Sequence, residues 1–225
     1  MPRNPATPPS VAAVVRRLDR GVTTAATSRL QHPVLWCAAP AVIAWFIPAS
    51  RDALLYDRTA ILQGEWWRLW TGHWVHFSAS HLAWNLAVLL GAGAWLERLQ
   101  PGSLLRFVAV AAPLLGLSFL AGAPDMHTYG GLSGLATGVV TLLALVQLRQ
   151  DSAGRAWWLA ALGLVALKIG FDATRSAPLF ASFDSGSIRV SVLAHVMGAL
   201  AALAFFLSRR GAARDEIRRP AVATP

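Results

Sequence analysis

The feature that most constrains this chain is a series of six apolar runs separated by polar connections. Each run has about the length that crosses roughly 30 Å of hydrocarbon as an α-helix. Apolar residues make up 55% of the chain and charged residues only 14%, and the charges fall almost entirely between the runs. The sequence therefore predicts an all-α membrane protein, a bundle of six transmembrane helices in one domain. The predicted runs are 34–49, 82–97, 104–123, 132–148, 156–171 and 190–208.

The net charge of +9 does not indicate a nucleic-acid partner, because the basic residues flank the apolar runs instead of forming one face of a soluble fold. Most of them lie in a basic N-terminal tail (1–33), a basic C-terminal tail (209–225) and the connections after the second and fourth runs. By the positive-inside rule both tails are predicted to be cytoplasmic, as an even number of spans requires. The N-terminal tail has no signal-peptide pattern, and the single cysteine, Cys37, is interpreted as an apolar filler of the first span.

The longest connection, 50–81, is unusually rich in tryptophan. Tryptophan favours the headgroup region of a bilayer, where the ring is half-buried and its N–H stays hydrated. We expect short helical pieces in the outer leaflet, with Trp67 as an aromatic anchor and Arg68 as a brace. His73 and His76 lack a third ligand, so a bracing role is favoured for them over a metal site. The sequence predicts neither a metal nor a cofactor.

Two polar residues in separate apolar runs are candidate catalytic residues. Ser133 and His195 stand at bilayer depth, where a polar side chain needs a protein partner or a hydrated cavity. A serine hydroxyl becomes a useful nucleophile when a neighbouring base accepts its proton. His81 and Asn85, one helical turn apart, can donate hydrogen bonds to an oxyanion together with the Ser133 amide. No Asp or Glu stands in the middle of a span, so the predicted site is a dyad.

Small residues recur around both candidate residues, at spacings that place them on one helix face. Gly134 and Gly138 follow the serine, and Ala194, Gly198 and Ala202 accompany the histidine. Close approach of two membrane helices requires such small residues. The pattern predicts that the fourth and sixth runs pack together and bring the serine and the histidine to their seam.

Other membrane-protein classes fit the sequence less well. An intramembrane aspartyl protease needs two carboxylates at depth, and a membrane metalloprotease usually needs a His-Glu-x-x-His run, which is absent. A transporter or channel would show paired charges or broken helices along a pathway. Here the polar groups instead converge on one site.

Four motifs in this order resemble the rhomboid family of intramembrane serine proteases over roughly residues 34–208. They are Trp67-Arg68, His81-x-x-x-Asn85, Gly131-x-Ser133-Gly134 and Ala194-His195-x-x-Gly198. The resemblance implies that Ser133 is the nucleophile, that His195 is the general base and then acid, and that His81 and Asn85 are oxyanion partners. It further implies transmembrane protein substrates, a bacterial inner-membrane location and a site that opens to the outer face. The sequence specifies no oligomeric state.

The Gly-Glu-Trp-Trp-Arg-Leu run and the approach to Ser133 are similar to the bacterial rhombosortase subgroup. That resemblance implies processing of tails composed of Gly-Gly, an apolar helix and a basic end. The chain departs from the family in having Thr137 where an aromatic residue often follows the serine, and Ala202 where glycine is frequent. Two alternatives stay open: a non-catalytic relative that only binds membrane helices, and resolution of the acyl-enzyme by another amine instead of water.

Overall fold

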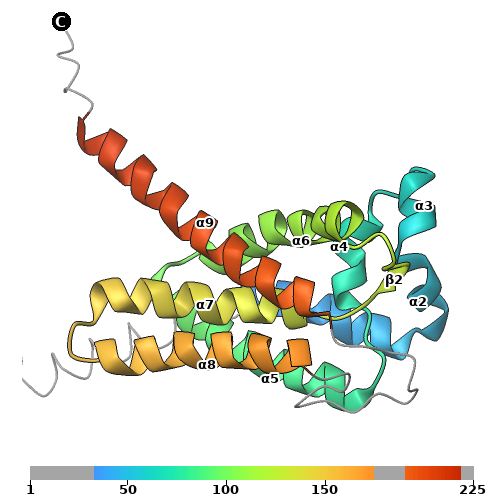
Figure 1. The fold of residues 1–225 in the computed structure, drawn as a ribbon, viewed down its shortest axis with the longest axis horizontal. Coiled ribbons are helices and arrows are strands. Elements are labelled where there is room, and N and C mark those ends of the chain that lie inside the picture. Colours follow the sequence, from blue (N-terminus) through green and yellow to red (C-terminus); the bar gives the residue numbers. More distant parts are fainter. Residues whose placement is uncertain (1–32, 175–190, 219–225) are drawn as a thin grey trace, which may run out of the picture.

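The structure is a computed structural model that describes residues 33–174 and 191–218, with side chains up to Arg209. The predicted N-terminal tail (1–33) and C-terminal tail (209–225) lie largely outside the described residues, as does most of the connection 172–189. Helices dominate the described part (Figure 1). Their order is a helix Pro33–Phe46, α2 Pro48–Leu54, α3 Arg58–Leu62, α4 Arg68–Thr71, η1 Gly72–Trp74, α5 Ala79–Leu99, α6 Ser103–Gly122, α7 Ser133–Gln150, α8 Arg155–Thr174 and α9 Val192–Arg218, with β1 Tyr56–Asp57 and β2 Thr128–Tyr129.

Every predicted apolar run corresponds to a helix, but the count of six spans is not reproduced. Four helices in the described residues are long and apolar enough to cross a membrane: α5, α6, α8 and the first part of α9. A fifth span results if Pro33–Phe46 and α2, bent by 118° at their junction, count as one. Pro48 stands just after this junction and cannot donate the backbone hydrogen bond that would continue the first helix.

Helix α7 is the most enclosed helix of the bundle. It contacts α5, α6, α8 and α9, which lie around it in Figure 1, and most of its residues are buried. Because other helices shield it from lipid, it tolerates Thr137, Thr141 and Gln147 as buried polar residues. This enclosure explains why its sequence is less apolar than that of the lipid-facing helices.

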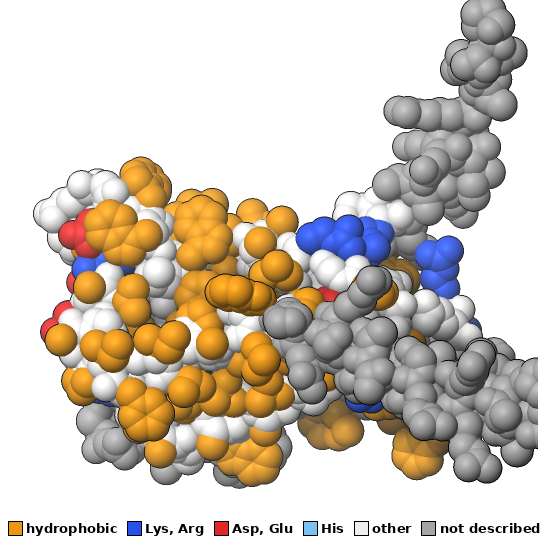
Figure 2. All heavy atoms as spheres, turned by 180° about the vertical axis from the view of Figure 1, so that it is seen from behind, with side chains coloured by type: hydrophobic (Ala, Val, Ile, Leu, Met, Phe, Trp, Pro, Cys, Tyr) orange, Lys and Arg blue, Asp and Glu red, His pale blue; other side chains and the backbone are white. Residues whose placement is uncertain are grey.

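The outer surface is apolar around the middle of the molecule, as expected of a body surrounded by lipid. Figure 2 shows hydrophobic side chains over this middle band, with Lys and Arg gathered toward the end where α9 leaves the bundle. Exposed residues of this kind include Trp157 and Leu164 of α8 and Leu105 of α6. Integral membrane character thus follows from both the helices and the surface.

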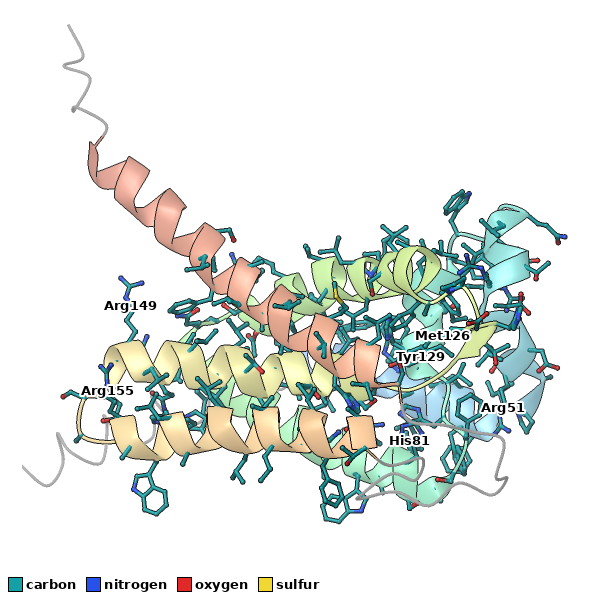
Figure 3. The ribbon with its side chains drawn as sticks, in the orientation of Figure 1. Arg51, His81, Met126, Tyr129, Arg149 and Arg155 are labelled. Carbon is teal, nitrogen blue, oxygen red and sulfur yellow. The ribbon has the colours of Figure 1, made fainter. Side chains whose placement is uncertain are left out.

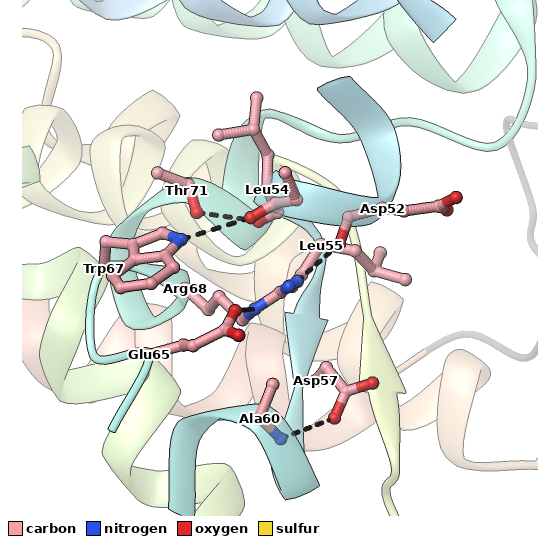
Figure 4. A network of polar contacts seen from close by, with 10 residues as sticks. Asp52, Leu54, Leu55, Asp57, Ala60, Glu65, Trp67, Arg68 and Thr71 are labelled. Atoms are coloured by element: carbon pink, nitrogen blue, oxygen red, sulfur yellow. Dashed lines mark hydrogen bonds and ion pairs between the residues drawn. The ribbon is translucent and has the colours of Figure 1, made fainter. Parts of the chain in front are cut away.

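Arg68 organises the long first connection from a nearly buried position (Figure 4). Its guanidinium donates to the carbonyl oxygens of Asp52 (2.6 Å) and Leu55 (2.8 Å) and to the Glu65 carboxylate (2.6 Å). Thr71 donates to the Leu54 carbonyl at 2.7 Å, on the same segment. These bonds satisfy carbonyl groups at the end of α2, where helix termini leave acceptors without partners.

Candidate active site

Ser133 is the first residue of α7, and the approach to it depends on glycine. Gly131 has a φ of +132°, a backbone conformation that side chains rarely adopt. A Cβ on Gly131 would also lie 2.6 Å from the His81 ring, so only glycine allows this close approach. Leu132 then turns inward with 1% exposure, and Ser133 begins the helix half-buried.

The segment before Ser133 is tied to the first connection by backbone bonds. Strands β1 and β2 pair antiparallel, with Tyr56 opposite Tyr129. The Gly131 amide donates to the Gly72 carbonyl at 3.3 Å. The Tyr129 hydroxyl donates to the Gly131 carbonyl at 2.8 Å, and the tyrosine side chain also interacts with that of Ser133. The tryptophan-rich connection therefore fixes the position of the serine.

His76 completes this support through both ring nitrogens. Its Nδ1 lies 3.0 Å from the Trp74 carbonyl, and its Nε2 accepts from the Leu132 amide at 3.4 Å. These partners require a neutral ring with the proton on Nδ1. Burial, followed by the nearby His81, lowers the pKa of His76 to about 3. The ring is held neutral as a brace of the serine loop.

His73 has a similar role on the other side of the connection. Its Nε2 lies 2.9 Å from the Ala112 carbonyl of α6, and the ring is 1% exposed. Burial lowers the pKa of His73 to about 4. Both histidines therefore contact the backbone of neighbouring segments, in keeping with the bracing role that the sequence favoured.

His195 stands near the start of α9, and α9 packs on α7 more extensively than on any other described helix. A Cβ on Gly134 would lie 2.8 Å from the Ala194 carbonyl, and one on Gly138 would lie 2.7 Å from the Gly198 carbonyl. A Cβ on Gly198 would overlap the Gly134 carbonyl. The backbones of α7 and α9 touch through these small residues at the start of α7.

The His195 ring is 1% exposed, and its two nitrogens differ. Nδ1 lies 2.9 Å from Oδ2 of Asp172, and the same oxygen lies 2.6 Å from Nζ of Lys168. Nε2 has no hydrogen-bond partner in the described structure. A buried nitrogen of this kind is rare enough to require an explanation.

The expectation that no carboxylate accompanies the histidine was wrong. Asp172 lies in the last turn of α8, one residue beyond the predicted run 156–171, and it reaches His195 from there. The available signal was the spacing of Lys168 and Asp172, which is the i, i+4 spacing of a helical ion pair. The predicted apolar run ends at residue 171, so it excludes Asp172.

His81 and Asn85 lie on the inner face of α5, both buried, and α5 contacts α7. His81 lies against Gly131 and interacts electrostatically with His195. The Asn85 amide nitrogen has no hydrogen-bond partner in the described structure. Figure 3 shows His81 and Tyr129 at the same end of the bundle, away from Arg149 and Arg155.

The remaining predicted positions are Thr137, Trp67, Ala202 and Cys37. Thr137 donates to the Ser133 carbonyl at 2.8 Å, a local bond within α7. Trp67 is half-exposed and donates to the Ala53 carbonyl at 3.2 Å. Ala202 is fully buried on α9, and Cys37 is buried in the first helix.

Comparison with known proteins identifies a family that this chain resembles. A family model described as the Rhomboid domain matches residues 63–210, which include α4 to α8 and most of α9. The chain is also similar to the protein named Rhomboid protease GluP from Bacillus subtilis (strain 168), with 32% identity over 92 residues. That match covers 41% of this chain and 18% of the relative, so the chain spans only about a fifth of the relative's length.

The fold and the family match define a class of membrane protein, helical proteins built on a Rhomboid domain. The chain belongs to the rhomboid family. The resemblance drawn from four sequence motifs is thereby confirmed at the level of the family.

Proposed function

We propose that this protein is an intramembrane serine endopeptidase in which Ser133 is the nucleophile and His195 the general base. The observation that carries the proposal is the contact of α7 with α9, together with the buried His195 Nε2, which has no hydrogen-bond partner among the described residues. A base must keep one nitrogen available for the proton of the nucleophile. His195 has Nδ1 engaged and Nε2 available, on the helix that packs against the start of α7.

The proposed reaction begins when Ser133 Oγ attacks the carbonyl carbon of a substrate peptide bond and His195 Nε2 takes the hydroxyl proton. The carbonyl π electrons move to its oxygen and form an oxyanion. Asn85 offers a buried N–H that has no partner within the part of the chain that the structure describes, and His81 and the Ser133 amide supply further donors. Collapse of the intermediate breaks the C–N bond, and His195 returns the proton to the leaving amine.

The acyl-enzyme that remains is resolved by water, with His195 again acting as base. Transfer to another amine uses the same residues and differs only in the attacking group. A shared test separates the two outcomes: mass spectrometry of the product shows a free carboxylate after hydrolysis and a new amide after transfer.

The proposed setting is the bacterial inner membrane, with both termini in the cytoplasm and the site open to the outer face. His81 and Tyr129 lie at the end of the bundle opposite Arg149 and Arg155 (Figure 3). Short loops rich in Arg remain on the cytoplasmic side. The substrates are transmembrane proteins that reach Ser133 from within the bilayer.

We also propose the rhombosortase type of substrate, whose tail combines Gly-Gly, an apolar helix and a basic end. Support comes from the sequence around Glu65-Trp66-Trp67-Arg68 and Tyr129-Gly130-Gly131. A reporter protein with such a tail should be cleaved, whereas the same reporter with Val-Val in place of Gly-Gly should stay intact. Equal cleavage of both reporters would exclude this substrate type without affecting the assignment of Ser133.

The test of the proposed function is Ser133→Ala, measured by labelling with a fluorophosphonate and by cleavage of the tail reporter. Both signals should fall to background while the thermal unfolding midpoint in detergent stays close to that of the unmodified protein. Ser118→Ala is the matched control, because Ser118 is a half-buried helix serine bonded to the Leu115 carbonyl. Binding of the reporter without cleavage by the unmodified protein would instead favour the helix-binding alternative.

A further inference from the structure

The ion pair of Lys168 and Asp172 is unusual for its place in the molecule. Asp172 is the only buried residue of α8, a helix whose other side chains are exposed or half-buried. Its carboxylate is 2% exposed, as is the His195 side chain that it contacts, whereas Lys168 is 29% exposed. A buried carboxylate near the bilayer is costly unless it is paired. The pairing here involves the candidate general base.

The contacts of His195 Nδ1 determine where the imidazole proton lies. An ionised carboxylate only accepts hydrogen bonds, so Oδ2 of Asp172 at 2.9 Å requires an N–H on Nδ1. Lys168 Nζ lies 3.2 Å from Nδ1 and only donates. Lys168 donates to Asp172 at 2.6 Å, a shorter contact than its 3.2 Å approach to the ring, so the carboxylate is its principal acceptor.

The same arrangement determines the protonation of Nε2, the other ring nitrogen of His195. In a neutral imidazole, a proton on Nδ1 leaves a lone pair on Nε2. Nε2 is the buried nitrogen that has no partner in the described structure. The ring is therefore oriented as a base with its lone pair available to a hydroxyl.

Among the described residues, the charged and titratable groups near His195 lie on two helices, α8 and α5. Helix α8 contributes Asp172 and Lys168, which cancel, and α5 contributes His81. The contacting turn of α7 contributes Ser133 and Gly134, neither of which is charged. When the ring takes a proton, Asp172 stabilises the imidazolium, while Lys168 prevents the resting site from carrying a net negative charge.

We propose that Asp172 is a positioning residue that holds the His195 proton on Nδ1, and that Lys168 balances its charge. The inference rests on the proposed function for its effect on rate, although the proton placement itself is independent of it. In this arrangement the serine and histidine act with a third member on α8. Asp172 touches no reacting atom and acts through the imidazole.

Nitrogen NMR of protein labelled with 15N-histidine tests the proton placement directly. The His195 signals, assigned by their loss in His195→Gln, should show a protonated Nδ1 and an unprotonated Nε2. In Asp172→Val, which has a similar volume and no acceptor, the protonated Nδ1 signal should disappear. A wild-type spectrum with an unprotonated Nδ1 would overturn the inference, because Lys168 would then be the donor to the ring.

Fluorophosphonate labelling measures the effect on reactivity. In this reaction Ser133 Oγ forms a bond to phosphorus, fluoride leaves with the P–F electron pair, and His195 takes the proton. Asp172→Val should lower the maximal labelling rate at least about tenfold while the half-saturating probe concentration changes less than about twofold. Asp125→Val removes an exposed carboxylate outside the site and is the matched control.

The pH dependence of labelling separates positioning from simple structural support. Without Asp172 the acid limb of the rate profile should move to lower pH, and in Lys168→Met it should move to higher pH. A purely structural ion pair would give unchanged profiles in both variants, which would overturn the inference. The double variant Lys168→Met with Asp172→Val removes both charges, keeps the pair neutral and shows whether the helix still folds.

The two proposals fail in different ways. If the unmodified protein shows no Ser133-dependent labelling, the protease assignment fails, while the NMR result still decides the role of Asp172. If labelling depends on Ser133 but not on Asp172, the protease assignment stands and the positioning role is overturned.

Discussion

Helices α7 and α8 lie side by side and have similar lengths of 18 and 20 residues, yet they are held in place by different means (Figure 1). α7 is enclosed by four helices and meets α9 through touching backbones. α8 faces outward along most of its surface and buries only Asp172. The serine side of the site therefore lies in the packed interior, whereas α8 reaches His195 through Asp172, its one buried residue. Substitutions should affect the two helices very differently.

The largest expected effect comes from forcing the packed seam apart with Gly198→Leu. A Cβ there overlaps the Gly134 carbonyl, and a backbone atom cannot move aside as a side chain can. Overpacking in a core commonly costs about 1–3 kcal/mol, and here the clash also separates the helices that carry Ser133 and His195. We expect loss of fluorophosphonate labelling and a large fall in the thermal unfolding midpoint.

Gly163→Leu on α8 is the control for this prediction, because a Cβ at Gly163 meets nothing within 4 Å. It should label and unfold like the unmodified protein. A Gly198→Leu protein that keeps normal labelling would show that the seam is not rigid.

Arg68→Ala should give the next largest effect, on the connection that supports α7. The substitution removes three charge-assisted hydrogen bonds and leaves the Asp52 and Leu55 carbonyls without their donor. We expect a loss of about 3 kcal/mol in unfolding free energy, measured by chemical denaturation in detergent. Glu65→Gln weakens only a partly exposed ion pair and should cost less than about 1 kcal/mol. Equal effects of the two variants would contradict the central place of Arg68.

Acidification should lower the free energy of unfolding through the same connection, by a smaller amount for each histidine than the loss of Arg68. His73 and His76 are neutral in the folded state, with pKa values lowered to about 4 and about 3 from the ordinary 6.5. As pH falls below 6.5, the unfolded chain binds protons that the folded protein does not, so stability declines. At pH 5 the loss should be at most about 2 kcal/mol for each histidine.

The measurement is the dependence of the unfolding midpoint on pH between pH 7 and pH 5, in the unmodified protein and in the His76→Gln variant. Glutamine does not titrate in this range, so the variant should start less stable and show a shallower pH slope. An unchanged slope would mean that His76 is not buried in its neutral form.

Much of this architecture could be predicted from the sequence. The six apolar runs coincide with helices because an uninterrupted apolar stretch in lipid must satisfy its backbone internally. Arg68 was identifiable as a brace because a charged residue among tryptophans at an interface needs several acceptors. The family could be inferred from four short motifs, since each contains residue types that few other membrane helices need.

Other features could not be inferred, because they depend on which helices are neighbours. The contact of Asp172 with His195 joins α8 and α9, and nothing in either run specifies that these two ends meet. The pairing of β1 with β2 joins two-residue strands, which are too short for any alternating pattern to appear. The count of six spans was not confirmed, because the enclosed α7 is less apolar than the lipid-facing helices and the first helix is bent by 118° at its end.

The smallest expected effect is that of Leu164→Ala on α8, which is compared with the same leucine-to-alanine substitution at Leu142 on α7. Leu164 of α8 is 66% exposed, whereas Leu142 of α7 is 1% exposed. Lipid is as apolar as a leucine side chain, so Leu164→Ala exchanges one apolar contact for another and should change the unfolding free energy by less than about 0.5 kcal/mol. Leu142→Ala leaves a cavity among packed helices and should cost about 2–5 kcal/mol. Unfolding of both variants in the same detergent decides the point. If Leu164→Ala were as costly as Leu142→Ala, the surface of α8 at Leu164 would have to be packed against protein instead of facing lipid.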